Sequence, residues 1–371
     1  MRITNVEALY LRLPEIKART DSSQDALLIR ISTDAGITGW GEVDGCPWVV
    51  KAIVEAPMSH TIVTGLRQVL IGEDPMEPER LWHKMYQATL YYGREGAVIQ
   101  AMAGVDLALW DIKGKALRMP VWQVIGARYR DRLRVYASNM MQFTPEANAE
   151  RVRKARDEGF TAAKFGWEPF GKDARTDCLF LDAMRTAAGS DFDLMLDVGL
   201  IWDATTTIQR AKLFEPYELA WIEEPLPPDD LAGYRKVSQR ILQRLAAGEE
   251  ECTLRGFERL IDEGGIGLAQ IDLTRCGLTQ ALKIAAHAQE RGIPVANHNF
   301  TTDINTAASL HFLAAVPNAL ILEYCVEPSE ISRALARNPI RLEDGCMRVP
   351  DEPGLGVEPD MAVVEKFLVR A

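Results

Sequence analysis

Leu194-Met195-Leu196-Asp197 begins the pattern that decides the fold of this chain, in which short apolar runs end in a charged residue. Further residues of this kind follow at positions 223, 249, 272, 298 and 323, and the first two intervals, from 197 to 223 and from 223 to 249, are both 26 residues. Between the runs, apolar residues at three- and four-residue spacing predict helices over Ala204–Phe214, Leu231–Arg244, Gly277–Arg291 and Asp303–Ala315. A strand followed by a helix at a fixed period is typical of a parallel (β/α) TIM barrel.

The charged residues at the strand ends predict one shared pocket. In a parallel barrel the carboxyl ends of all strands open on the same face, so these side chains are expected to converge. Asp197, Glu223 and Glu249 come from three neighbouring strands, and three carboxylates form a site for a hard cation. A single acidic residue in this position is commonly only the N-cap of the next helix. Three in successive units, with His298 in phase and able to move a proton, favour an active site.

Length and charge limit the class of protein. A chain of 371 residues predicts two domains, one of which has room for a barrel of about 250 residues. The formal net charge of -11 argues against nucleic acid as a partner, because its phosphates require a basic face. An anionic small molecule stays compatible with this charge, since a bound divalent ion and local lysines reverse the field inside a pocket.

The cysteines and the apolar segments indicate the compartment. The six cysteines form no Cys-x-x-Cys pair and no zinc-like spacing, which predicts free thiols in a reducing environment. Met1-Arg2-Ile3-Thr4 contains no apolar signal region, and no stretch approaches the length needed to span a bilayer. We therefore expect a cytoplasmic protein that does not insert into a membrane.

Three regions are predicted along the chain. Residues 1–126 form an α+β capping domain, in which a β-meander precedes helices that are clearest over Gly96–Leu117. Residues 127–325 alternate strand and helix and form the barrel. Residues 326–371 are rich in turn signals and form a C-terminal segment that returns to the cap.

The chain resembles the enolase superfamily, specifically its mandelate racemase and muconate-lactonising branch. The matching segments, in this order, are Gly36–Glu42, Val105–Lys115, Trp221–Pro225, Gln270–Gly277 and Pro353–Gly356. The resemblance implies a modified (β/α) TIM barrel under an N-terminal α+β capping domain that the C-terminal tail completes. It also implies a homo-oligomer.

The resemblance further implies a Mg²⁺ ion held by Asp197, Glu223 and Glu249. The ion would bind a substrate carboxylate and stabilise the enediolate that forms when the α-proton is removed. Glu224 adjoins Glu223, and Glu250 and Glu251 follow Glu249, but the family pattern favours the first residue of each run. His298 would act as base or acid beside Asp272, and Glu323 would donate a hydrogen bond to the other substrate oxygen.

Two positions depart from the family pattern. The second barrel strand commonly ends in Lys-x-Lys, whereas this chain has Lys164 at the first lysine and Gly166 at the second. The frequent Asp-x-Asn of the third strand is Asp197-Val198-Gly199. The missing second lysine argues against a reaction that needs a base on each face of the substrate.

Together with these departures, the resemblance implies an enzyme that dehydrates a sugar acid, either an aldonate or an aldarate. One histidine can remove the α-proton and then return it to the departing hydroxyl, so a second base is not needed. The alternatives are cycloisomerisation of a sugar-acid lactone or anhydro sugar acid, and epimerisation or racemisation with Lys164 as the missing base. A non-catalytic binder of carboxylated sugars is a further alternative, of a different class.

Substrate specificity is expected to reside mainly in two segments of the cap, Pro14–Asp25 and Glu42–Trp48. Asp44 belongs to the second segment. Trp167, Glu168 and Tyr92 are further candidates for contact with the substrate.

Overall fold

The computed structural model describes residues 1–370, and the cap begins with a three-stranded antiparallel sheet. Its strands are β1 (Ile3–Arg12), β2 (Asp25–Thr33) and β3 (Thr38–Val43), in that order. Gly36 has φ 75° in the turn between β2 and β3, a conformation that glycine adopts without strain. The meander predicted from the sequence is therefore present.

The cap helices cover this sheet, and the longest of them packs directly on β3. They are α1 (Pro47–Glu55), α2 (Leu66–Leu70), α3 (Pro78–Thr89), α4 (Ala97–Leu117) and α5 (Val121–Ile125). A Cβ atom on Gly39 or Gly41 would lie 2.2 Å or 2.0 Å from a backbone oxygen of α4. The glycines of the segment Gly36–Glu42 thus allow the two backbones to approach each other.

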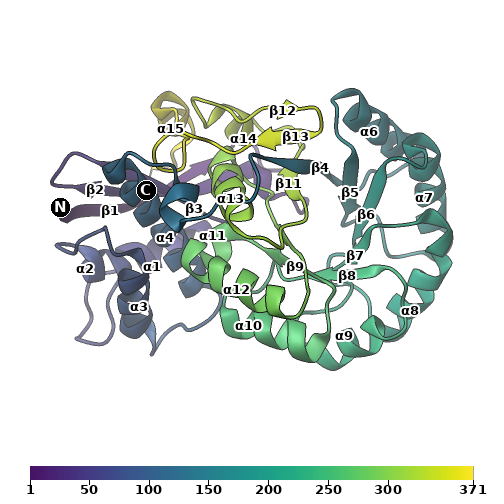
Figure 1. Ribbon diagram of the computed structural model, residues 1–371, viewed down its shortest axis with the longest axis horizontal. Helices are drawn as coiled ribbons and strands as arrows, with labels where there is room; N and C mark the ends of the chain where they lie inside the picture. The colour runs from purple at the N-terminus through teal and green to yellow at the C-terminus, as the bar shows by residue number, and fades with distance from the viewer. Residues whose placement is uncertain (371) are drawn as a thin grey trace.

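Eight parallel strands follow and form the barrel (Figure 1). They are β4 (Arg132–Met140), β5 (Ala162–Gly166), β6 (Asp193–Asp197), β7 (Trp221–Glu223), β8 (Arg244–Ala247), β9 (Leu268–Ile271), β10 (Val295–Asn297) and β11 (Leu322–Cys325). β11 pairs in parallel with β4. Between β10 and β11, a parallel bridge joins Val295 to Ala319, and Glu323 N donates to Asn297 Oδ1 at 2.7 Å. The sheet therefore turns back on itself, and the predicted fold class is confirmed.

Helices surround these strands, and most begin at a side-chain cap. They are α6 (Pro145–Asp157), α7 (Ala174–Ala188), α8 (Ala204–Leu213), α9 (Leu231–Ser238), α10 (Leu254–Arg259), α11 (Leu273–Cys276), α12 (Leu278–Glu290) and α13 (Asp303–Ala315). The prediction of one helix over Leu231–Arg244 was wrong, because α9 ends at Ser238 and Arg244 already belongs to β8. The apolar spacing continues through Leu242, but this side chain is 84% exposed and does not face the core.

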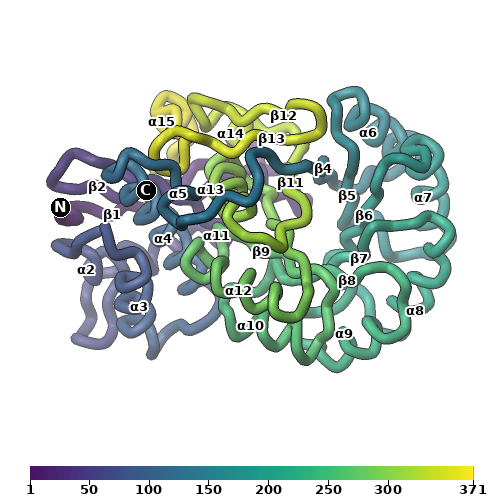
Figure 2. Tube along the Cα trace, in the orientation of Figure 1, coloured from purple at the N-terminus to yellow at the C-terminus, as the bar shows by residue number. Residues whose placement is uncertain are grey.

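The C-terminal segment returns across the barrel to the cap. It contains α14 (Glu330–Ala334), β12 (Leu342–Glu343), β13 (Cys346–Arg348) and α15 (Met361–Phe367). Three short helical turns earlier in the chain complete the elements: η1 (Ser22–Gln24), η2 (Glu215–Tyr217) and η3 (Leu260–Gly264). β13 pairs antiparallel with β4, and Val369 N donates to Tyr10 O at 2.8 Å. Both chain termini consequently lie on the side of the cap (Figure 2). Within residues 1–370, no helix is long and apolar enough to cross a membrane.

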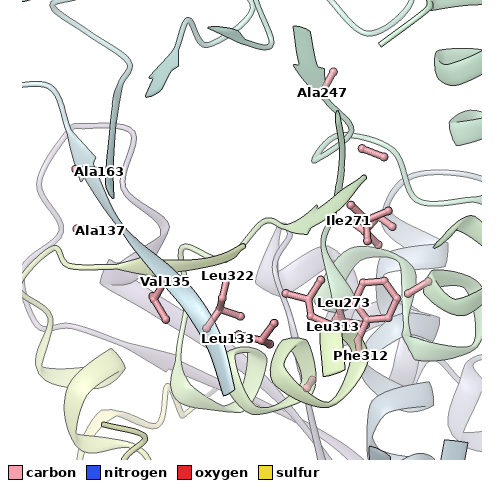
Figure 3. Packing of buried hydrophobic residues seen from close by; sticks show 14 of the residues in the cluster. Leu133, Val135, Ala137, Ala163, Ala247, Ile271, Leu273, Phe312, Leu313 and Leu322 are labelled. Atoms are coloured by element: carbon pink, nitrogen blue, oxygen red, sulfur yellow. The ribbon is translucent and has the colours of Figure 1, made fainter. Parts of the chain in front are cut away.

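Apolar side chains pack on both the outer and the inner face of the barrel strands. Outside the ring, Val135 of β4 lies beside Leu322 of β11, and Leu273 lies near Phe312 and Leu313 of α13 (Figure 3). A separate cluster packs together Tyr136, Met195, Trp221, Ala246, Leu268, Ala296 and Ile321. These residues belong to the strands, except Ile321, which directly precedes β11, and they fill the interior of the ring. The polar residues at the carboxyl ends of the parallel strands collect at one mouth.

Buried carboxylates of the cap bind the first turns of two barrel helices. Asp106 of α4 accepts hydrogen bonds from Thr279 N at 2.8 Å and Thr279 Oγ1 at 2.6 Å, in the first turn of α12. Glu42 of β3 accepts hydrogen bonds from Thr302 Oγ1 at 2.9 Å and Asn305 N at 3.1 Å, at the start of α13. The cap therefore supplies N-terminal caps to the barrel.

Replacement of Asp106 by alanine is expected to destabilise the protein by about 2–4 kcal/mol, because the buried N–H and hydroxyl of Thr279 lose their acceptor. The comparison is Asp203→Ala, which removes the exposed cap of α8, where water can replace the carboxylate. Urea unfolding of both variants measures the difference. An Asp106→Ala protein no less stable than Asp203→Ala would contradict the assignment.

Candidate active site

Three buried carboxylates from successive strands meet at the mouth of the barrel. Asp197 is the last residue of β6, Glu223 is the last residue of β7, and Glu249 follows β8 by two residues. Their oxygen atoms lie within 4.8 Å of one another. Glu224 belongs to a second acidic group, with Glu249 and Glu250, and its Oε1 accepts a hydrogen bond from Gly248 N at 3.0 Å. Glu223 is the glutamate of this pair that lies with Asp197.

The electrostatics of this cluster favour a bound cation. Burial and the charge of Glu223 raise the pKa of Asp197 well above its usual range, and burial also raises the pKa of Glu223. Within residues 1–370, Glu249 Oε2 is buried and accepts no hydrogen bond. Three carboxylates with an oxygen left unpaired suit a hard divalent ion, which would relieve their mutual repulsion.

Lys164 lies below this cluster, in the middle of β5. Its ammonium group forms ion pairs with Glu223 and, at 2.8 Å, with Glu323 Oε1. Burial alone would lower the pKa of Lys164, but the charges of these two carboxylates raise it well above its usual range. The indole of Trp221 donates a hydrogen bond to the other oxygen of Glu223 at 2.8 Å. Lys164 is thus a fixed positive charge with two partners.

His298 and Asp272 form a close pair on the other side of the mouth. His298 follows β10, and its Nδ1 lies 2.7 Å from Asp272 Oδ2. The second oxygen of Asp272 accepts hydrogen bonds from Thr274 N at 2.7 Å and Thr274 Oγ1 at 2.6 Å, at the start of α11. Because Asp272 is held in this way, it fixes the orientation of the imidazole through Nδ1, and Nε2 lies on the side of Glu249.

The histidine is electrostatically coupled to the carboxylates. Its Nε2 lies 3.5 Å from Glu249 Oε2. Burial alone would lower the pKa of His298, but the charge of Glu249 and the hydrogen bond with Asp272 raise it to about 10. Glu323 completes the group, since its Oε2 accepts a hydrogen bond from Asn299 N at 2.9 Å.

These groups surround a cavity of about 240 Å³ between the barrel and the cap. It is lined by Thr20, Ser22, Ser138, Asn139, Met140, Lys164, Trp167, Asp197, Glu249, Glu250, Arg275, His298 and Phe300. The first cap segment thus reaches the cavity, and Ser22 Oγ donates to Phe300 O at 3.2 Å. In the second segment, Glu42 and Val43 belong to β3 and helix α1 begins at Pro47, so its loop is shorter than predicted.

The structure brings some of the predicted substrate contacts to this cavity and leaves others outside. Trp167 lines the cavity. Asp44 forms an ion pair with Arg275, another residue of the cavity lining, and Asp44 Oδ2 lies 2.9 Å from Arg275 Nη2. Glu168 has a side chain that is 69% exposed and paired with Lys172. Tyr92 lies in the cap, where its hydroxyl donates to Thr64 O at 2.7 Å.

Comparison with known proteins identifies the family of this chain. The family model described as mandelate racemase / muconate lactonizing enzyme, N-terminal domain, matches residues 3–126. The model described as enolase C-terminal domain-like matches residues 147–363, more than half of the chain. The chain belongs to the mandelate racemase and muconate lactonizing branch of the enolase superfamily.

Members of this branch that are similar to the chain include named enzymes. D-galactarolactone cycloisomerase of Agrobacterium fabrum is 30% identical over 92% of this chain and 90% of its own length. D-xylonate dehydratase of Haloferax volcanii is 31% identical over 94% of this chain and 87% of its own length. A racemase from Streptomyces coelicolor with bound magnesium superposes with a TM-score of 0.88, at 29% identity, over 99% of this chain and all of its own. The prediction of an enzyme, a lyase or an isomerase, is confirmed.

The two departures from the pattern of this branch have a common structural setting. A Cβ atom on Gly166 would lie 2.5 Å from Asp197 Cβ, so a side chain there would displace a carboxylate of the cluster. A Cβ atom on Gly199 would lie 2.9 Å from the indole of Trp167, which itself has φ 68°. The glycines thus accommodate Asp197 and Trp167, and no second lysine or amide is present at these positions.

Sequence reasoning missed Arg275 as a residue of the site. Its guanidinium contacts Asp44, Glu249 O at 2.9 Å, and the carboxylate of Glu250 at 3.6 Å. It lies three residues after Asp272 in the segment Gln270–Gly277, which the sequence had marked only as a match to the family. An arginine one helical turn after a candidate catalytic aspartate was the signal available.

Addition of MgCl₂ to metal-free protein is expected to raise its melting temperature, since an ion that binds only the folded state stabilises it. Glu223→Gln should abolish this increase, because the amide removes charge from the cluster. The matched control is Glu250→Gln, which lowers the charge of a neighbouring exposed residue and should keep the increase. An undiminished magnesium effect in Glu223→Gln, measured by differential scanning fluorimetry after chelator treatment, would refute the assignment of the cluster.

Proposed function

We propose that this protein is a magnesium-dependent dehydratase of sugar acids in which His298 is the base and then the acid. The observation that carries the proposal is that His298 is the histidine that lines the cavity, with Nδ1 held by Asp272 and Nε2 3.5 Å from Glu249 Oε2. Lys164 is engaged by Glu223 and Glu323, and Gly166 offers no base. A single histidine favours a reaction in which the same group takes and returns one proton.

The substrate carboxylate would lie beside the acidic cluster, within reach of Lys164. Asp197, Glu223 and Glu249 would hold magnesium, which supplies positive charge that stabilises the enediolate. Lys164 adds a fixed positive charge on the side of β5 and orients the carboxylate. Glu323 keeps the ammonium in place from β11 through its ion pair at 2.8 Å.

The proton would move through His298 alone. Nε2 takes the proton from the carbon beside the carboxylate, while Asp272 stabilises the imidazolium through Nδ1. The electron pair left on that carbon expels the hydroxyl of the next carbon, and Nε2 returns the proton to it, so that water departs. The resulting enol rearranges to a 2-keto-3-deoxy acid.

Cycloisomerisation is the second candidate, favoured by the similarity to D-galactarolactone cycloisomerase. It begins with the same proton removal but yields a product of unchanged mass. Incubation with a panel of acid sugars and magnesium, followed by semicarbazide detection of 2-keto acids and mass spectrometry, distinguishes the two. Keto acid with loss of 18 Da, about one water, supports dehydration.

His298→Asn is expected to abolish turnover and the exchange of the substrate α-proton with deuterated water, because the only base is removed. The magnesium-induced rise in melting temperature should persist, which shows that the variant is folded. Proton exchange is followed by NMR.

Lys164→Met is the matched comparison and should retain some exchange, since it removes a charge that orients the substrate. If His298→Asn exchanges the α-proton and Lys164→Met does not, Lys164 is the base and His298 is the acid that expels the leaving group. The single-base argument is then wrong, and the epimerase alternative returns.

A further inference from the structure

We infer that this site takes a sugar acid with one carboxylate and an uncharged far end, and that it discriminates against dicarboxylate aldarates. The inference rests on the proposed function and specifies its substrate class. It follows from the positive charges around the cavity, each of which already has an anionic partner. A second carboxylate would therefore find no free cation.

Three residues that line the cavity can carry positive charge: Lys164, His298 and Arg275. The first two belong to the reacting end. Lys164 pairs with Glu223 and Glu323, and His298 pairs with Asp272 at 2.7 Å. Only Arg275 is left to receive a carboxylate at the other end of a sugar acid.

Arg275 is held by the protein through both terminal guanidinium nitrogens. Nη2 lies 2.9 Å from Asp44 Oδ2 and Nη1 lies 2.9 Å from Glu249 O, whereas Nε, 3.8 Å from Asp272 Oδ2, makes no hydrogen bond within residues 1–370. The side chain is only 14% exposed. Withdrawing it to bind a substrate carboxylate would leave Asp44 without its partner in a largely buried position, which is costly.

The lining that faces the rest of the substrate is negative or neutral. Glu250 lines the cavity with a side chain that is 38% exposed, and it lies 3.6 Å from the guanidinium of Arg275. The other polar groups are hydroxyls and an amide, on Thr20, Ser22, Ser138 and Asn139. Such groups match the hydroxyls of a polyol chain, whereas Glu250 would repel a second carboxylate.

The arginine of the first cap segment is also engaged. Arg19 pairs with Asp21 and lies 3.6 Å from Glu327 Oε2. Glu327 is buried and is paired with Arg151 at 2.8 Å as well. This segment therefore brings neutral hydroxyls to the cavity and keeps its arginine outside the cavity lining.

The test compares aldonates with aldarates of the same configuration: D-gluconate with D-glucarate, D-galactonate with galactarate, and D-xylonate with xylarate. Each is assayed with excess magnesium for 2-keto acid formation and for α-proton exchange in deuterated water, and binding is measured by calorimetry. We expect the aldonate of the best pair to have a kcat/KM at least about 100-fold higher and to bind more tightly. An aldarate that equals or exceeds its aldonate overturns the inference and leaves the proposed function intact.

If no member of the panel reacts or exchanges, and none binds, the proposed function fails and the inference fails with it. If acids bind without reacting, calorimetry alone decides, and tighter binding of aldarates overturns the inference.

Glu250→Gln tests the origin of the discrimination. Removal of this charge should raise the aldarate to aldonate ratio of kcat/KM by about 10-fold. The matched control is Glu168→Gln, which removes an equal charge outside the cavity and should leave the ratio unchanged. An unchanged ratio in Glu250→Gln, or an equal rise in both variants, overturns the assignment of Glu250.

Discussion

The ion pairs of Lys164 are the interaction on which the site depends. Removing Glu223 and Glu323 from water costs free energy unless a positive charge lies close to both, and the ammonium group of Lys164 does so. The three residues come from β5, β7 and β11, so the pairs connect strands on both sides of the mouth.

Much of the fold and of the candidate site could be predicted because a barrel converts a sequence period into a shared location. Asp197, Glu223 and Glu249 were predicted from their interval, and the structure brings their oxygens together. The period does not specify where loops fold. Glu168 therefore lies in solvent, Tyr92 lies in the cap away from the cavity, and helix α9 ends earlier than its apolar spacing suggested.

Other features depend on contacts between distant residues. The sequence shows that Gly166 and Gly199 replace larger side chains, but not that Asp197 and Trp167 occupy the space. It likewise shows an arginine at position 275 without the carboxylates of the cap and barrel that surround it. The division at residues 126 and 325, a homo-oligomer and a cytoplasmic location stay predictions, since they concern boundaries, partners and surroundings rather than contacts within the chain.

The carboxylates of Glu42 and Asp106 have a consequence for how such proteins diverge. Each cap residue completes the first turn of a barrel helix, and α13 begins only five residues after His298. If a whole cap domain is exchanged between relatives, the new cap must therefore provide acidic residues that accept hydrogen bonds from the first turns of the same barrel helices. Without them, the start of α13, close to His298, is no longer held in place. Residues 14–24, which touch the cavity but cap no barrel helix, are free of this demand. New specificities are thus more accessible through this segment than through recombination of entire domains.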